Sequence, residues 1–113
     1  MLKIGVNESE ILFILNNLRK EDKDELMEVY GKNWFQTAFW DIKDDDSSLV
    51  LYGLDNTKNN VPIAIGGFYN QSEYDCSVCC VWLLCTKYIE NNKTLFFKTF
   101  KNQIEEASDK YTL

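Results

Sequence analysis

The stretch VPIAIGGFYNQSEYDCSVCCVWLLCT, from Val61 to Thr86, decides the fold of this chain. It contains two apolar runs, Val61 to Phe68 and Val78 to Thr86, and the polar segment Tyr69 to Asp75 lies between them. Apolar runs on both sides of a polar segment predict a hairpin of two antiparallel strands. Both faces of the second run are apolar, so this strand needs cover on both sides of the sheet.

Helices and strands are predicted before and after the hairpin. Met1 to Val6 is short and apolar, which favours an initial strand. Asn7 followed by Glu10 has the spacing of a capping box, which predicts a helix that ends at Asn16-Asn17. The other elements expected are a helix over Leu18 to Tyr30 ended by Gly31, a short helix over Asn33 to Ile42, a strand over Leu49 to Leu54, a polar turn over Asp55 to Asn60, a loop over Tyr88 to Asn92 and a helix from about Lys93 to Lys110.

The apolar positions predict which faces of the helices meet the core. The continuous run Ile11 to Leu15 indicates a first helix that is buried on most sides. The second helix has its apolar stripe at Leu26, Val29 and Tyr30, and the last helix has its stripe at Phe96, Phe100, Ile104 and Ala107. The order is strand, two or three helices, three antiparallel strands and a helix, which is an α+β chain with a mixed, mostly antiparallel sheet. We expect one domain over residues 1–113.

Composition restricts the classes of function. The chain has 113 residues and a net charge of −6, which disfavours a surface that follows nucleic-acid phosphates. No apolar run reaches the ~18 residues of a membrane-spanning helix. The N-terminus lacks the long apolar core and cleavage site of a signal peptide, which favours an intracellular location.

Metal binding is not expected, although four cysteines lie close together in the sequence. Cys76, Cys79, Cys80 and Cys85 lack the two separated pairs of a zinc ribbon, and alternation along a strand points neighbouring thiols to opposite faces. We expect buried free thiols at these positions. The acidic run Asp44 to Asp46 lacks the spacing of a calcium loop and is expected to be a solvated loop.

No catalytic residue is predicted. The chain has no histidine, so a general base would have to be a carboxylate, a tyrosine or a cysteine. Glu73, Asp75 and Tyr88 are expected at the ends of the sheet, but carboxylates in polar loops are usually only solvated. An aromatic cluster leaves two alternatives open: it covers the open side of the sheet, or part of it is exposed and binds a partner. Its members are Trp34, Phe35, Phe39 and Trp40.

Four segments resemble a known family. They are Asn17 to Glu25, Val61 to Gly67, Trp82 to Thr86 and Ile104 to Leu113. Together they are similar to the second helix, third strand, fourth strand and following helix of the GNAT family of N-acetyltransferases. The nearest likeness is to the GNAT-like internal virion proteins of short-tailed phages, the internal core protein A group, and it covers essentially the whole chain. The resemblance implies the N-terminal part of the GNAT fold, without the family's C-terminal strands.

The resemblance also implies where a cofactor would bind. Active members hold the coenzyme A pyrophosphate on a glycine-rich loop between the fourth strand and the next helix. Here the matching segment, Thr86 to Thr94, contains no glycine and places Glu90 near the phosphates. If acetyl-CoA binds, the resemblance implies contacts with Leu84, Thr86 and Asn91. Lys87 and Lys93 would be phosphate partners. On the alternative interpretation Asn91-Asn92 only caps the last helix.

The leading hypothesis is a non-enzymatic GNAT-like phage protein with a role in virion structure or assembly. It would need no cofactor, and its location would be the host cytoplasm or the virion interior. One alternative is an acetyl-CoA-dependent N-acetyltransferase. Another is an acidic inhibitor of a host enzyme, although lysine and arginine are interspersed with the acids. We also expect a protein partner or self-association through the strand Val78 to Cys85, because exposed apolar edges invite strand pairing.

Overall fold

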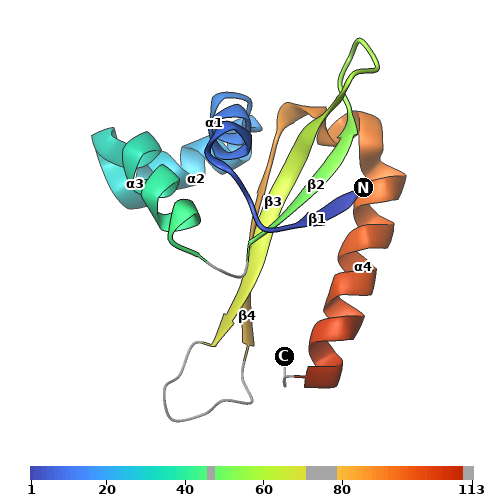
Figure 1. Cartoon of the computed structure of the whole chain (residues 1–113). Coiled ribbons are helices and arrows are strands. Elements are labelled where there is room, and N and C mark those ends of the chain that lie inside the picture. The colour runs from blue at the N-terminus through green and yellow to red at the C-terminus, as the bar shows by residue number, and fades with distance from the viewer. Residues whose placement is uncertain (46–47, 71–78, 111–113) are drawn as a thin grey trace.

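The computed structural model describes residues 1–45, 48–70 and 79–110, with side chains except at 68–70, 79–81 and 107–110. Figure 1 shows α1, α2 and α3 on one side of a four-stranded sheet and α4 on the other side. The elements in order are β1 (Leu2–Ile4), α1 (Glu8–Asn16), α2 (Lys20–Tyr30), the 3-10 helix η1 (Gly31–Asn33), α3 (Trp34–Lys43), β2 (Leu49–Leu54), β3 (Asn60–Asn70), β4 (Cys79–Cys85), the 3-10 helix η2 (Lys87–Asn92) and α4 (Lys93–Lys110).

The chain is α+β, and the predicted order of elements is confirmed. The strands lie in the order β1-β2-β3-β4, and every described pair is antiparallel, so the sheet is not mixed. The predicted hairpin is formed by β3 and β4, with Ala64 opposite Cys85 and Gly67 opposite Trp82. β3 extends two residues into the predicted turn. The rest of that turn, Gln71 to Asp75, lies outside the described residues, as does Val78.

The capping box at the start of α1 is present and joins three elements. The Asn7 side chain accepts a hydrogen bond from the Glu10 backbone N–H at 2.8 Å, and the Glu10 carboxylate accepts from the Asn7 backbone N–H at 2.9 Å. Glu10 is buried, and its carboxylate also accepts from the Lys3 ammonium at 2.7 Å and from the Tyr52 hydroxyl. This one carboxylate therefore ties α1 to β1 and β2.

The same contacts change the acidity of both partners. Burial by itself would raise the pKa of Glu10, but the hydrogen bonds from Lys3, Tyr52 and Asn7 outweigh burial and lower that pKa. The hydrogen bond to Glu10, together with burial, raises the pKa of Tyr52 to about 12. Tyr52 therefore remains a hydrogen-bond donor throughout the physiological range.

The core consists of two clusters. One joins α1 and α3 to the sheet, and Leu26, Trp82 and Leu84 pack against it. The other includes the residues at the end of β4 and in η2, and Phe96 of α4 packs against it. The buried members of the first cluster are Ile11, Ile14, Leu15, Ala38, Ile42 and Ile65, and those of the second are Leu51, Ile63, Ala64, Cys85 and Ile89.

Three expectations about apolar faces are wrong in part. Leu12 is 41% exposed, because α1 lies on one face of the sheet and only its inner side is covered. In α2, Leu26 packs against the core, but Val29 is 68% exposed and Tyr30 is also exposed, because both line an open groove. In α4, Phe96 packs inward whereas Phe100 is 38% exposed.

The aromatic cluster divides between the two alternatives. Phe35 and Phe39 pack against the first core cluster, which agrees with a covering role. Trp40 is 55% exposed, and the Lys43 ammonium lies 4.8 Å from its ring centroid. Gly31 ends α2 as expected, with φ at +70°, and α3 follows after one turn of 3-10 helix. The predicted loop over Tyr88 to Asn92 is instead part of η2.

Candidate functional site

An open groove lies beside β4, the last strand of the sheet order. α2 and α3 form its other wall, and its volume is about 590 Å³. Pockets of ~300–1,000 Å³ are the usual size for ligand sites. The residues that line the groove are Asp22, Glu25, Leu26, Val29, Tyr30, Ala38, Asp41, Ile42, Asp45, Trp82, Leu83 and Leu84.

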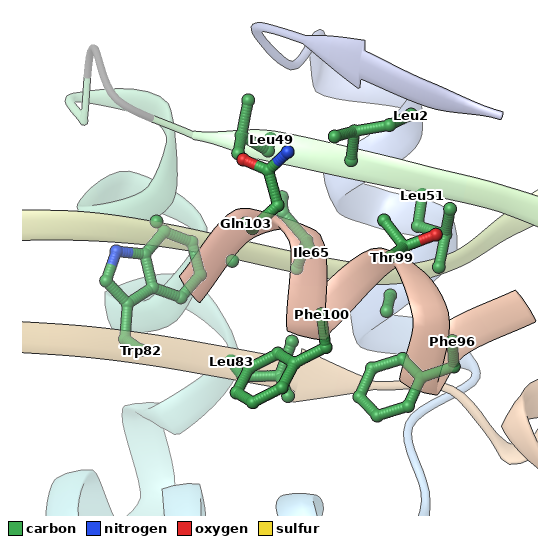
Figure 2. A pocket seen from close by; sticks show the side chains of 13 residues that line it. Leu2, Leu49, Leu51, Ile65, Trp82, Leu83, Phe96, Thr99, Phe100 and Gln103 are labelled. Atoms are coloured by element: carbon green, nitrogen blue, oxygen red, sulfur yellow. The ribbon is translucent and has the colours of Figure 1, made fainter. Parts of the chain in front are cut away.

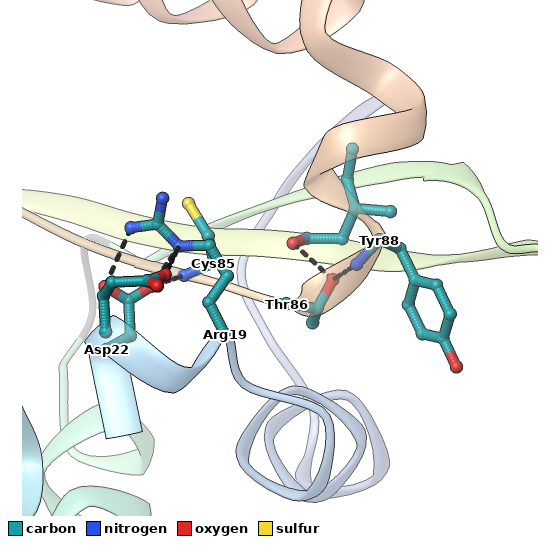
Figure 3. A network of polar contacts seen from close by, with 7 residues as sticks. Arg19, Asp22, Cys85, Thr86 and Tyr88 are labelled. Atoms are coloured by element: carbon teal, nitrogen blue, oxygen red, sulfur yellow. Dashed lines mark hydrogen bonds and ion pairs between the residues drawn. The ribbon is translucent and has the colours of Figure 1, made fainter. Parts of the chain in front are cut away.

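Asp22 lines the groove. Its side chain bonds to the C-terminal end of β4 (Figure 3). Its carboxylate accepts a hydrogen bond from the Cys85 backbone N–H at 2.7 Å, and it pairs with the Arg19 guanidinium at 3.0 Å. The Arg19 backbone N–H in turn donates to the Cys85 carbonyl at 3.0 Å. The start of α2 therefore occupies the outer edge of β4 at this residue. The hydrogen bond with Asp22 raises the pKa of Arg19, so the guanidinium stays charged.

The rest of the groove is acidic. The Asp41 carboxylate accepts from the Tyr30 hydroxyl at 3.2 Å, and the Asp45 carboxylate accepts from the Trp82 indole N–H at 3.0 Å. Burial and the bond to Asp41 raise the pKa of Tyr30. Glu25 is exposed and forms no ion pair with a described residue. None of the described lining residues is a lysine or an arginine, so the groove has a negative potential.

The position of Trp82 depends on a glycine. Its indole lies over Gly67, the residue opposite it on β3. A Cβ atom added at Gly67 would lie 2.6 Å from the indole nitrogen, which is closer than such atoms approach. Gly67 therefore leaves the space in which the indole reaches Asp45.

The segment after β4 has no free amides for a phosphate at its start. The Lys87 N–H donates to the Asn17 carbonyl at 2.9 Å, and the Tyr88 N–H donates to the Thr86 hydroxyl at 3.3 Å. The Ile89 N–H donates to the Thr86 carbonyl at 3.1 Å. These are the amides at the beginning of η2, which runs directly into α4. The Glu90 carboxylate lies 2.9 Å from the Lys93 ammonium, so that cation is also engaged.

The alternative interpretation, in which Asn91-Asn92 only caps the last helix, is wrong. The cap of the helical segment is Thr86, because the 3-10 helix η2 precedes α4 without a break. Asn92 instead holds the end of β2: its side chain accepts from the Leu54 N–H at 3.0 Å and donates to the Leu54 carbonyl at 2.8 Å. The Asn91 amide donates to the Asn56 side chain at 2.6 Å.

The three residues proposed for coenzyme A do not form one site. Leu84 is half-buried against the first core cluster. Thr86 is fully buried, and both its N–H and its hydroxyl donate to the Ile63 carbonyl, at 2.8 and 2.9 Å. Asn91 is exposed beside the turn between β2 and β3. The hydroxyl and backbone N–H of Thr86 and the amide nitrogen of Asn91 therefore bond within the chain.

A second, smaller cavity lies between the sheet and α4 (Figure 2). Its volume is about 60 Å³, which is room for a few water molecules at most. Leu83, Phe96 and Phe100 form one side of it, and the residues around it are almost all apolar. It is a packing gap under the last helix, and it is too small for a cofactor.

The thiols and acid–base candidates are only partly described. Cys85 is a buried free thiol, as expected, and burial with the nearby Asp22 charge raises its pKa to about 11. The ring of Tyr88 stacks against Phe13 at 6.2 Å between centroids. Within residues 1–45, 48–70 and 79–110, no group of three or more metal-ligating side chains converges. Cys76, Glu73 and Asp75 lie outside the described residues, as do the side chains of Cys79 and Cys80.

Comparison of the chain with family models, curated proteins and solved structures found no match. The described part of the chain also contains no helix with the length and apolar character needed to cross a membrane.

Sequence reasoning missed the groove and the contact of Asp22 with β4. Asp22 and Cys85 are 63 residues apart, so no local pattern predicts the bond between them. The spacing of the acids is a usable signal: Asp22 and Glu25 are three residues apart, as residues on one helix face are, and Asp41 and Asp45 are four apart. Nothing in the sequence shows that the two pairs face one another.

Proposed function

We propose that this chain is a non-enzymatic GNAT-like protein that acts by binding another protein, in virion structure or assembly. The observation that carries the proposal is the state of the backbone amides after β4. At Lys87, Tyr88 and Ile89 each amide donates within the chain, at 2.9 to 3.3 Å. An anion could bind there only if these bonds were broken.

Other features of the same region support the proposal. Burying a phosphate near Glu90 would bring like charges together, and the segment has no glycine to let the backbone approach an anion closely. The start of α2 covers the edge of β4 at Cys85, where the resemblance would place the cofactor beside the strand. The chain has the sheet and helices but no preformed site for the coenzyme A pyrophosphate, which is consistent with a protein that acts by binding another protein through its surface.

Calorimetric titration with acetyl-CoA tests the non-enzymatic part. We expect no saturable heat and no shift in melting temperature, because no site for the pyrophosphate is preformed. A matched titration with a known acetyltransferase under the same conditions serves as the positive control. Binding at micromolar affinity, or release of coenzyme A thiol with any amine of a panel, would contradict the proposal and favour the N-acetyltransferase.

The setting in the virion is supported by the sequence resemblance to internal virion proteins of short-tailed phages. Mass spectrometry of purified particles of the phage that encodes the chain tests it. We expect the chain at a fixed ratio to the capsid protein. Its absence from particles, with abundant protein in the infected cell, would refute the virion role and leave the non-enzymatic part standing.

A further inference from the structure

We propose that the outer edge of β4 binds an extended segment of a partner protein in which lysine or arginine alternates with apolar residues. The inference rests on the proposed function, because a cofactor beside β4 would exclude such a segment. Three features of the described residues support it: an open strand edge, carboxylates on one side of that edge, and exposed apolar side chains on the other side.

The backbone of β4 can receive another strand. Both polar backbone groups of Cys85 point away from β3, since its N–H donates to Asp22 and its carbonyl accepts from Arg19. Alternate residues of a strand direct their backbone groups to the same side, so those of Leu83 and Val81 also point outward. On this side of β4, the described chain forms only the bridge between Leu18 and Thr86, at the end of the strand. An added strand would satisfy the outward groups of Leu83 and Val81.

The carboxylates select positive charge on one face of the added strand. Trp82 and Leu84 pack toward the first core cluster, so side chains on the same face of an added strand would lie over the groove. There they would meet Glu25 and Asp41, both of which are exposed, with no lysine or arginine among the described lining residues. Cationic side chains are the complement of this surface.

The other face of the added strand would meet apolar surface. Leu83 is 37% exposed and lies beside the Phe100 ring in Figure 2. Phe100, which lines the same cavity as Leu83, is 38% exposed. Because side chains of a strand alternate between faces, the partner pattern that satisfies both sides is cation, apolar, cation, apolar.

A second copy of the chain fits this edge less well than a cationic partner. Pairing of two β4 edges about a two-fold axis would bring two acidic grooves together, and each chain has a net charge of −6. Like charges placed opposite one another disfavour association. The edge expected from the sequence to support self-association or a partner is therefore assigned here to a partner of opposite charge.

Fluorescence anisotropy with synthetic peptides tests the inference. The probe is a labelled peptide of about seven residues in which lysine and valine alternate. When the peptide adds antiparallel to β4, the residue opposite Leu83 shares its face and exchanges backbone bonds with it, so the valine amides bond to β4 and the lysine amides point away. N-methylation of the valine amides should weaken binding at least about tenfold, and N-methylation of the lysine amides should change it less than about threefold.

Protein variants test the groove with a matched control. The double variant Glu25→Lys/Asp41→Lys should lose at least about tenfold in affinity, because it reverses two charges at the groove. The control Asp24→Lys/Glu106→Lys makes the same change in net charge outside the groove lining, and it should change affinity less than about threefold. Circular dichroism confirms that both variants are folded.

Several outcomes would overturn the inference. The inference fails if the alternating peptide does not bind. It also fails if the two N-methylations have equal effects, or if the two double variants have equal effects. Sedimentation that shows a dimer competing with the peptide would overturn it as well. A parallel titration with acetyl-CoA separates the two failures. Binding of acetyl-CoA would refute the proposed function. If neither acetyl-CoA nor the peptide binds, only the strand-binding inference is refuted.

Discussion

Replacement of Asp22 with alanine removes the carboxylate that joins the start of α2 to the end of β4. Asp22 is 6% exposed, and it accepts hydrogen bonds from the Cys85 backbone N–H at 2.7 Å and from the Arg19 guanidinium at 3.0 Å. The variant leaves the Cys85 N–H without its acceptor in a buried place. It also leaves Arg19 without its closest partner.

The size of the effect follows from these contacts. A buried N–H that loses its acceptor costs ~1–3 kcal/mol of unfolding free energy. Loss of the Arg19 pair adds ~0–1 kcal/mol, because Arg19 is 37% exposed and partly screened by water. We therefore expect Asp22→Ala to lower the unfolding free energy by ~1–4 kcal/mol. Asp22→Asn keeps an acceptor for Cys85 and should lose only about half as much.

Asp24 offers a control on the same helix. It pairs with Lys20 at 3.5 Å, and both side chains are largely exposed, so Asp24→Ala should cost at most ~0.5 kcal/mol. Urea denaturation followed by tryptophan fluorescence measures all three variants. If Asp22→Ala were no less stable than Asp24→Ala, the contact between α2 and β4 would not contribute to stability as described here.

Three further predictions concern Tyr52, Glu10 and Cys85. The difference in absorbance at alkaline pH between the native chain and Tyr52→Phe should show one phenol with a pKa of about 12. Ionisation of Tyr52 near pH 10 would exclude the bond to Glu10. The stability that this raised pKa contributes is present below pH 10.0 and is lost as the pH rises to about 12. Because the pKa of Glu10 is lowered in the folded chain, its carboxylate stabilises the fold near neutral pH, and this stability is lost as the pH falls through the pKa of the folded state. In urea denaturation, Glu10→Gln should therefore be less stable than the native chain at pH 7, and the difference should be much smaller in strong acid. The Cys85 thiol, whose pKa is raised to about 11 by burial, should resist alkylation at pH 8 in the folded chain and react in urea, as peptide mass mapping would show; equal labelling in both states would contradict its burial.

Local patterns in the sequence predicted most of the elements. The capping box at Asn7 and Glu10, the end of α2 at Gly31 and the bounds of β2 depend on neighbouring residues, and all three are confirmed. The hairpin was also predictable, because two apolar runs on either side of a short polar segment are typical of two antiparallel strands joined by a turn. These features are encoded within a few residues of where they occur.

Contacts between distant segments could not be predicted in the same way. Val29 and Tyr30 have the spacing of a buried stripe, but α2 leaves a groove beside β4, and so they remain exposed. Asn91 and Asn92 have the composition of a cap, yet their amides bond to the turn and strand between residues 54 and 56. In each case the partner comes from another part of the chain, which periodicity does not identify.

The contact between Trp82 and Gly67 links two positions that are 15 residues apart. Any side chain at position 67 would displace the indole from Asp45, whereas a small residue at position 82 would remove the need for glycine. Evolution can therefore change this pair only in a fixed order, with tryptophan lost before glycine is replaced. Among relatives of this chain, the residues at 67 and 82 should covary, and that covariation would mark the β3–β4 register in sequences too distant to align by other means.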